Sequence, residues 1–271
     1  MANQQLPLSN GVRLYVVDEG SGTPVVFVHG VMMSGRFFDR QVPYFSQSFR
    51  VIVPDLRGHG QSEKVLHGHS VANYAHDLQA LFDSLQIERP VLVGWSMGAM
   101  VVYEYLKQFG QADVAGIVIV DQPPSDFAWE GYEFGGFTVH SLGAMVESLQ
   151  MNQRAVAERL TNLMLHAPSP EVASWMVEEI MRSPAAIATT ILVNQTLQDY
   201  RPFLAEISLP TLVLFGRDNK LTPPEAGEYI VSHIPGAKLQ IFEHSSHVPF
   251  YEEAEVFNET VRTFVERVRG A

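Results

Sequence analysis

Residues 91–100 read VLVGWSMGAM, and this stretch decides the predicted fold. A short apolar run is followed by G-x-S-x-G at residues 94–98, and helical spacing continues from there to residue 109. Glycine is needed on both sides of the serine because a sharp strand-to-helix turn leaves no room for a Cβ. Such a turn holds the Ser96 hydroxyl out over the sheet, at the start of a helix. Ser96 is therefore the candidate nucleophile, although a plain turn serine would also fit the motif alone.

Other short apolar runs alternate with segments of helical periodicity. Short runs of this kind, buried on both faces, are typical of strands in a parallel sheet. Strands that alternate with helices predict an α/β fold with a doubly wound, mostly parallel sheet. Asn10-Gly11 between two apolar runs also predicts a β-hairpin near the N-terminus. The predicted strands lie in residues 25–28, 51–53, 91–93, 116–120 and 211–215, and the predicted helices in 71–85, 97–109, 225–234 and 250–268.

One segment interrupts this alternation. Residues 123–209 contain helical spacing and no predicted strand, with Ser169-Pro170 and Ser183-Pro184 each resembling an N-cap followed by proline. We interpret this segment as a helical cap, or lid, inserted into a core formed by residues 1–122 and 210–271. A cap over the carboxyl edge of the sheet would cover the place where such sheets bind ligands.

The composition is that of a globular protein. Of the 271 residues, 46% are hydrophobic and 18% charged, and the formal net charge is −12. A surface this acidic repels phosphate backbones and anionic lipids, so we expect no nucleic-acid or membrane partner. There is no cysteine, which excludes disulfides and thiolate metal sites. The N-terminus lacks the pattern of a signal peptide, and we expect a soluble cytoplasmic protein.

The loop after the first predicted parallel strand reads His29-Gly30-Val31-Met32. In this architecture an amide from that loop joins the amide after the nucleophile to form an oxyanion hole. The expected donors are the backbone N–H groups of Val31 and Met97. We interpret His29 as structural, bonded to the loop backbone.

The histidine that activates the serine should come late in the chain, after the last strand. His247, in the loop before the last helix, is the candidate, while His244 lies nearer the strand end and is interpreted as structural. The glycine-rich turn at residues 55–62 is also read as structural. His67 and His69 form H-x-H without a convincing third ligand, so we expect no metal.

These motifs resemble the esterase and cofactor-free haloperoxidase branch of the α/β-hydrolase superfamily. The resemblance rests on the two motifs that contain Gly30 and Ser96, the turn at 55–62, residues 199–201 and His247-Val-Pro. It implies an α/β-hydrolase fold and ester hydrolysis through an acyl-enzyme, without a cofactor. Ser96 stands where dehalogenases and epoxide hydrolases of the superfamily carry aspartate. Met32 stands where perhydrolase-like members carry proline, which disfavours peracid chemistry.

The third member of the triad departs from the superfamily pattern of glycine, two residues, aspartate, three residues, proline. Between Gly216 and Pro223 the acid position falls on Asn219, an amide that cannot carry negative charge. Asp218 is adjacent but out of register, so its side chain should point elsewhere. Asp121, at the end of a strand, is the favoured acid, because some dehalogenase-like members place their acid there. It could instead cap the backbone where the insertion begins, and Asp218 stays an alternative.

The substrate is expected to be a small-to-medium, uncharged carboxylic ester bound in an apolar pocket. The candidate pocket residues are Met32, Phe37, Trp95, Trp129 and Phe134, although aromatic residues of the insertion could simply pack its core. Two other functions stay open: a hydrolase-fold receptor with slow turnover, and a lactonase or carbon–carbon bond hydrolase. The small-molecule substrate is the one expected partner, and the sequence leaves the oligomeric state open.

Overall fold

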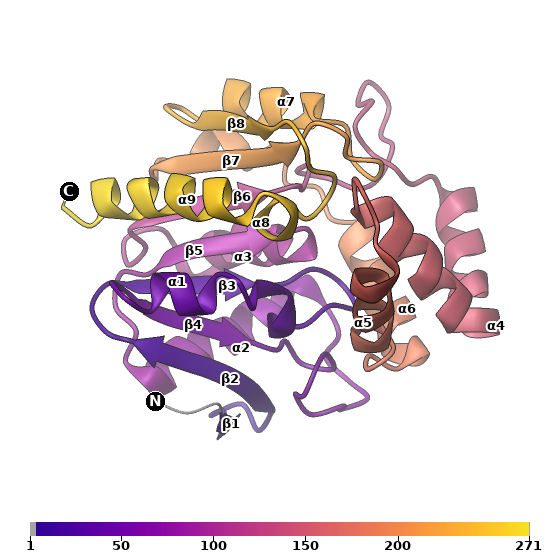
Figure 1. Ribbon diagram of the computed structural model, residues 1–271, viewed down its shortest axis with the longest axis horizontal. Coiled ribbons are helices and arrows are strands. Elements are labelled where there is room, and N and C mark those ends of the chain that lie inside the picture. The colour runs from indigo at the N-terminus through magenta and orange to yellow at the C-terminus, as the bar shows by residue number, and fades with distance from the viewer. Residues whose placement is uncertain (1–3, 271) are drawn as a thin grey trace.

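The computed structural model describes residues 4–270 and contains one eight-stranded sheet (Figure 1). The strand order is β1-β2-β4-β3-β5-β6-β7-β8. The first two pairs, β1 with β2 and β2 with β4, are antiparallel, and the others are parallel. The predicted doubly wound, mostly parallel α/β sheet is confirmed. The strands are β1 (Gln4–Pro7), β2 (Arg13–Gly20), β3 (Pro24–Val28), β4 (Arg50–Pro54), β5 (Val91–Trp95), β6 (Gly116–Val120), β7 (Thr211–Gly216) and β8 (Lys238–Phe242).

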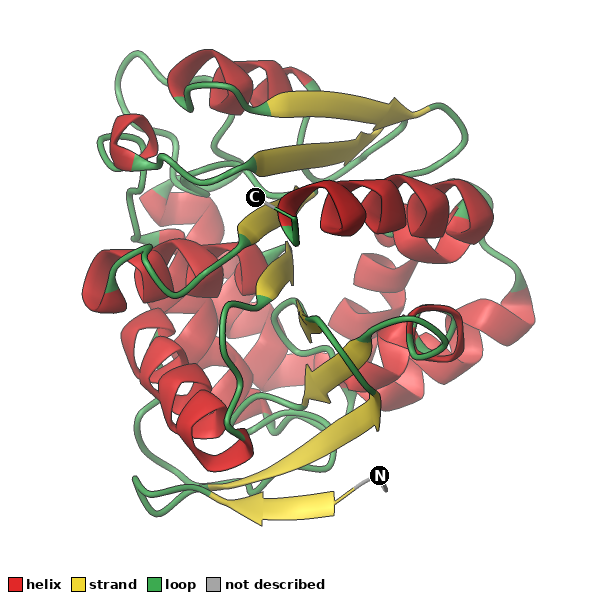
Figure 2. Cartoon of the chain, turned by 90° about the vertical axis from the view of Figure 1, so that its left-hand side faces the viewer, coloured by secondary structure: helices red, strands yellow, loops and turns green. Residues whose placement is uncertain are grey.

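Helices cover both faces of the sheet, as Figure 2 shows on either side of the twisted strands. One face packs against α2 (Val71–Leu85), α3 (Met97–Phe109) and α7 (Glu225–His233). The other packs against α1 (Val42–Phe45) and α9 (Ala254–Val268). Every residue of β5, β6 and β7 is therefore buried, which explains why these strands are continuous apolar runs.

The local patterns predicted several element boundaries. Helices α2 and α3 have the predicted bounds, and the predicted hairpin joins β1 to β2 with Gly11 at φ 84°. The apolar-run criterion misses β8, because that strand is only partly buried and reads KLQIF. The predicted helix at 250–268 is divided into α8 (Pro249–Glu252) and α9, since Glu253 has non-helical angles of φ −118° and ψ 50°.

Three longer helices lie between β6 and β7 and stand together beyond the ends of the strands (Figure 1). They are α4 (Val139–Met164), α5 (Pro170–Ile180) and α6 (Ala185–Thr196), followed by the short 3₁₀ turn η2 (Leu204–Glu206). Ser169 caps α5 as predicted, its hydroxyl accepting from the Val172 amide at 3.3 Å.

The prediction that Ser183 caps α6 is wrong. The N-cap position falls on Pro184, and the Ser183 hydroxyl donates instead to the carbonyl of Gly58 at 3.0 Å. A long-range contact has replaced the local cap.

Residues 1–3 and 271, at the two ends of the predicted core, lie outside the described residues. No helix within residues 4–270 is both long enough and apolar enough to cross a membrane.

Candidate active site

Ser96 occupies a strained turn between β5 and α3. Its backbone has φ 52° and ψ −128°, a region that a side-chain-bearing residue enters only when the surrounding structure enforces it. A Cβ on Gly94 would lie 2.6 Å from the Ala99 Cα, and one on Gly98 would lie 2.1 Å from the Val28 carbonyl oxygen. Both motif glycines are thus required by close backbone contacts, as the sequence predicted.

The loop after β3 lies directly against Ser96. A Cβ added to Gly30 would be 3.1 Å from the Ser96 Cβ and 3.4 Å from its Oγ. Val31 follows in this loop, and Met97 is the first residue of α3, so its N–H lies outside the intrahelical hydrogen-bond ladder. The two amides expected to form the oxyanion hole therefore belong to segments that meet at Ser96.

His29 is held by the backbone on both sides of its ring. Its Nδ1 donates to the Gly30 carbonyl at 2.7 Å, and its Nε2 accepts from the Leu56 amide at 2.9 Å. Burial lowers the pKa of His29 to about 4, so the ring is neutral. These contacts support the interpretation of His29 as a structural residue that fixes the loop at residues 29–32, called the oxyanion loop here for its expected role.

His247 lies in the loop between β8 and α8, against the residue that precedes Ser96. Its carbonyl accepts from the Trp95 indole Nε1 at 2.8 Å, and its amide donates to the Met164 carbonyl at 2.9 Å. The imidazole is 5.7 Å from the Trp95 ring, measured between centroids. Burial lowers the pKa of His247 to about 3. A neutral imidazole is the form that a general base requires. His244, by contrast, is exposed.

The acid position holds a chain of three side chains. The Asn219 Nδ2 donates to the Asp121 Oδ1 at 2.7 Å and lies 3.3 Å from the His247 Nδ1. Asp121 is fully buried, with φ 48°, and its Oδ1 also accepts from the Gly216 amide at 3.1 Å. Burial raises the pKa of Asp121 well above its ordinary value. Its Oδ2 has no hydrogen-bond partner within residues 4–270.

Asp218 points away from this chain, as its register predicted. Its Oδ2 is 2.6 Å from the Nδ1 of His166, and its side chain is 48% exposed. The structure therefore brings Asp121, and not Asp218, into contact with the group beside His247.

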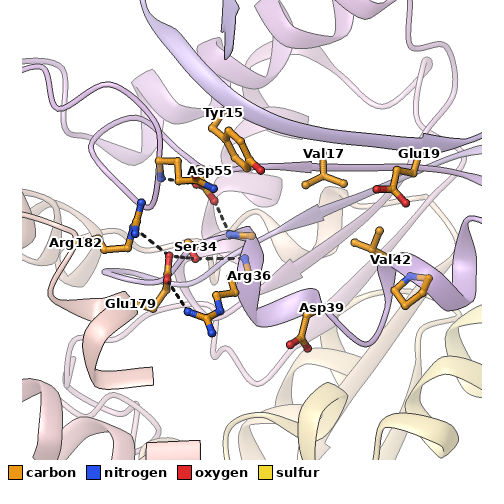
Figure 3. Close-up of a pocket in the computed structure, with 13 residues that line it drawn as sticks. Tyr15, Val17, Glu19, Ser34, Arg36, Asp39, Val42, Asp55, Glu179 and Arg182 are labelled. Atoms are coloured by element: carbon orange, nitrogen blue, oxygen red, sulfur yellow. Dashed lines mark hydrogen bonds and ion pairs between the residues drawn. The ribbon is translucent and has the colours of Figure 1, made fainter. Parts of the chain in front are cut away.

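Two carboxylates clamp the segment that follows the oxyanion loop (Figure 3). Asp55 accepts from the Gly35 amide at 2.6 Å and from the Gln61 amide at 2.6 Å. Burial is the main cause that raises the pKa of Asp55 to about 6. These contacts support the structural interpretation of the turn at residues 55–62.

The second carboxylate comes from the helical insertion. Glu179 of α5 is only 5% exposed and accepts from the Ser34 hydroxyl at 2.8 Å. Arg36 and Arg182 each place a nitrogen 3.4 Å from its carboxylate oxygens. A cavity of about 570 Å³, whose lining includes Asp55 and Glu179 but not Ser96, opens beside this clamp. Glu179 is not recognisable from the sequence, because nothing in its local pattern distinguishes it from a solvent-facing glutamate.

The predicted pocket residues have different surroundings. Trp95 and Phe37 have no exposed surface, and their rings, 5.3 Å apart, pack with other core aromatics. Both side chains therefore pack in the core, and their contact with a substrate stays a prediction. Met32 is 4% exposed, while Trp129 and Phe134 are partly buried in the segment after β6.

Trp129 and Phe134 contact aromatic and polar neighbours. The Trp129 Nε1 donates to the Ser125 hydroxyl at 2.8 Å, and the Phe134 ring lies 5.6 Å from that of Tyr229. Their role in substrate binding stays a prediction.

Comparisons with known proteins identify the family of the chain. Residues 23–254 match the family described as alpha/beta hydrolase fold, and the chain belongs to this family. Over 258 residues it is 29% identical to an AB hydrolase superfamily protein, YisY, of Bacillus subtilis, covering 93% of this chain and 95% of that protein. Over 269 residues it is 27% identical to a non-heme haloperoxidase of Rhodococcus erythropolis, covering 95% and 97%.

Its fold is also similar to that of an esterase from Exiguobacterium antarcticum. The TM-score is 0.93 at 25% sequence identity, and the match covers 98% of this chain and all of that one. The resemblance to the esterase and haloperoxidase branch is confirmed.

Proposed function

We propose that this chain is a serine esterase that cleaves small-to-medium, uncharged carboxylic esters through an acyl-enzyme. The observation that carries the proposal is Ser96 on a strained turn, with the Gly30 backbone against its hydroxyl and His247 against the preceding residue. The similarity to an esterase and a haloperoxidase supports the same class of chemistry.

The reaction consists of two acyl transfers. His247 removes the Ser96 proton at Nε2 while the Ser96 oxygen attacks the ester carbonyl, and the amides of Val31 and Met97 stabilise the oxyanion. The alcohol leaves with the proton from His247, and an acyl-enzyme remains. Water then loses a proton to His247 and attacks the acyl group, which releases the carboxylic acid and restores Ser96. Losing one oxyanion donor typically costs about 3–4 kcal/mol.

The remaining parts of the chain take supporting roles in this proposal. Residues 1–122 and 210–271 form the hydrolase core, and residues 123–209 form a lid whose Trp129 and Phe134 contact the acyl group together with Met32. Asp121 supports His247 as the acidic group of the triad. The chemistry requires neither a cofactor nor a metal.

Replacing the nucleophile tests the proposal. Ser96→Ala should abolish both the hydrolysis of a panel of nitrophenyl esters and covalent labelling by a fluorophosphonate probe, while the circular dichroism spectrum is kept. Ser84→Ala in α2 is the matched control and should behave as the unmodified chain. An Ser96→Ala protein that still labels and turns over would show that Ser96 is not the nucleophile.

One observation favours a second candidate, a hydrolase-fold receptor that turns its ligand over slowly. Asn219 occupies the position from which a carboxylate would contact His247 directly. A weaker base lowers turnover without altering the shape of the site. Many turnovers of a nitrophenyl ester per protein molecule would decide for the esterase, and a single acylation followed by a stall would decide for the receptor.

A further inference from the structure

Asn219 stands between a buried carboxylate and the proposed base, and the direction of its amide is fixed. The Asn219 Oδ1 accepts from the backbone amides of Leu221 at 2.9 Å and Thr222 at 3.2 Å. Rotating the amide by half a turn would break both bonds. The Nδ2 group must therefore face Asp121 and His247, at 2.7 and 3.3 Å.

We propose that Asn219 is a positioning residue through which the carboxylate of Asp121 acts on His247. This inference rests on the proposed function and adds a group between acid and base. Asp121 supports the imidazole across one intervening amide, whereas a triad acid accepts directly from the ring.

The number of hydrogens on the Asn219 amide explains why Asp121 is needed. Nδ2 carries two hydrogens, and three acceptors surround it: Asp121 Oδ1 at 2.7 Å, Thr222 Oγ1 at 2.7 Å and His247 Nδ1 at 3.3 Å. The two shorter contacts compete with His247 for these hydrogens, so the contact with Nδ1 is the weakest of the three. A hydrogen donated to Nδ1 would place the ring proton on Nε2, the nitrogen that has to accept from Ser96.

By holding one amide hydrogen, Asp121 therefore protects the tautomer that catalysis requires. When the Asp121 carboxyl is ionised, its charge also lies one side chain away from the imidazolium that forms when Ser96 gives up its proton. Within residues 4–270 the Asp121 Oδ2 has no hydrogen-bond partner, in keeping with the burial that raises the pKa of this carboxyl.

The other charged groups near His247 have partners of their own. Glu252, on α8, accepts from the amides of Ser246 and His166. Lys220, next to Asn219, donates to the Leu165 carbonyl at 2.8 Å. Asp218 pairs with the side chain of His166. Among the described residues, Asp121 is thus the carboxylate that reaches the group beside the imidazole.

Exchanging the two side chains tests the inference. Asp121→Asn alone should lower kcat by about 10- to 100-fold, less than the roughly 10⁴-fold loss typical of a carboxylate in direct contact with the histidine. Asn219→Ala should cause a loss of the same size, because it removes the connecting amide. The double variant Asp121→Asn, Asn219→Asp keeps one acid and one amide but places the acid beside His247. It should recover at least the original kcat, and its activity should fall at a higher pH than that of the unmodified chain.

Asp218→Asn is the control, since this carboxylate is adjacent to Asn219 in sequence but faces His166. It should keep kcat within about twofold. An Asp121→Asn protein of unchanged kcat would overturn the inference, and so would a double variant no better than Asp121→Asn. A fully active Asn219→Ala protein would show that the coupling does not pass through the amide.

A readout independent of catalysis separates this inference from the proposed esterase activity. Nitrogen-15 NMR of the imidazole reports the tautomer and titration of His247, whose signals are identified by their loss in His247→Gln. Asp121→Asn should increase the fraction protonated on Nε2, and the double variant should raise the pKa of the ring. If these shifts occur in a chain that hydrolyses no ester, the coupling stands and the proposed function fails. If the ring does not respond to either change, the coupling is wrong whatever the activity.

Discussion

The clamp between the helical insertion and the oxyanion loop makes a quantitative prediction. Glu179→Gln keeps the size of the side chain but removes the charge that faces Ser34, Arg36 and Arg182. The neighbouring Glu178→Gln is the matched control, because Glu178 is 61% exposed and pairs with Arg154 at the surface.

The expected loss of stability is small. Arg36 and Arg182 are 55% and 45% exposed, so solvent screens their ion pairs to well under about 1 kcal/mol each. Weakening the buried bond from Ser34 costs about another 1 kcal/mol, because a bond to a charged group becomes a bond to a neutral one. A total near 1–2 kcal/mol lowers the Tm of a chain of this size by about 2–8 °C.

The expected effect on catalysis is larger than the effect on stability. Ser34 lies three residues after Val31, and the Ser34 hydroxyl is one of the contacts that join this segment to α5. Complete loss of an oxyanion donor costs about 10²- to 10³-fold in kcat, so a displaced Val31 amide should cost about 10-fold. KM should change little, because the oxyanion develops only in the transition state.

Steady-state kinetics on a nitrophenyl ester at 25 °C, well below the Tm of either variant, measures this effect. Inhibition by a phenylboronic acid, which forms a tetrahedral adduct with the serine, should weaken in proportion to kcat. Glu178→Gln should match the unmodified chain both in kcat and in its inhibition by the phenylboronic acid. Equal kinetics for the two variants, or a KM effect without a kcat effect, would refute the reasoning that α5 positions the oxyanion loop.

Two further predictions concern pH and the insertion. Because burial lowers the pKa of His247 to about 3, the base stays neutral in weak acid, and kcat/KM should not halve on going from pH 7.5 to pH 5; a profile that halves near pH 6.5 would contradict this. Trp129→Ala and Phe134→Ala should change the preference for acyl chain length more than they lower the Tm, as measured on an ester panel and by thermal melting. Unchanged selectivity with a lowered Tm would identify both residues as packing residues of the insertion.

Local sequence patterns were sufficient to predict most of the fold and the sharp turn that carries Ser96. Strands buried on both faces have to be continuous apolar runs, so β5, β6 and β7 were recognisable without any knowledge of their neighbours. The turn at Ser96 was equally visible, because the close contacts at Gly94 and Gly98 exclude any side chain there. The strand β8 is only partly buried and has no continuous apolar run, so the same criterion does not detect it.

The proposed acid, Asp121, and the clamp around Glu179 depend on contacts between distant parts of the chain. Asp121 and Asn219 are 98 residues apart, and only the pairing of β6 with β7 brings their strand ends together. The bond between Ser34 and Glu179 spans 145 residues and requires α5 to fold back onto the oxyanion loop. No local sequence pattern predicts that Asp121 meets Asn219 or that Ser34 meets Glu179.

Burial of individual side chains was also decided by the tertiary structure. An aromatic residue beside a catalytic motif can face a pocket or the core, and its sequence neighbours are the same in both cases. Trp95 faces the core because α8, α9 and the segment around Phe37 close over that side of β5. The sequence by itself determined which backbone segments form the strands and the serine turn, since their requirements are local and steric. The tertiary structure alone decided which side chains meet around His247, since that depends on how separate segments pack.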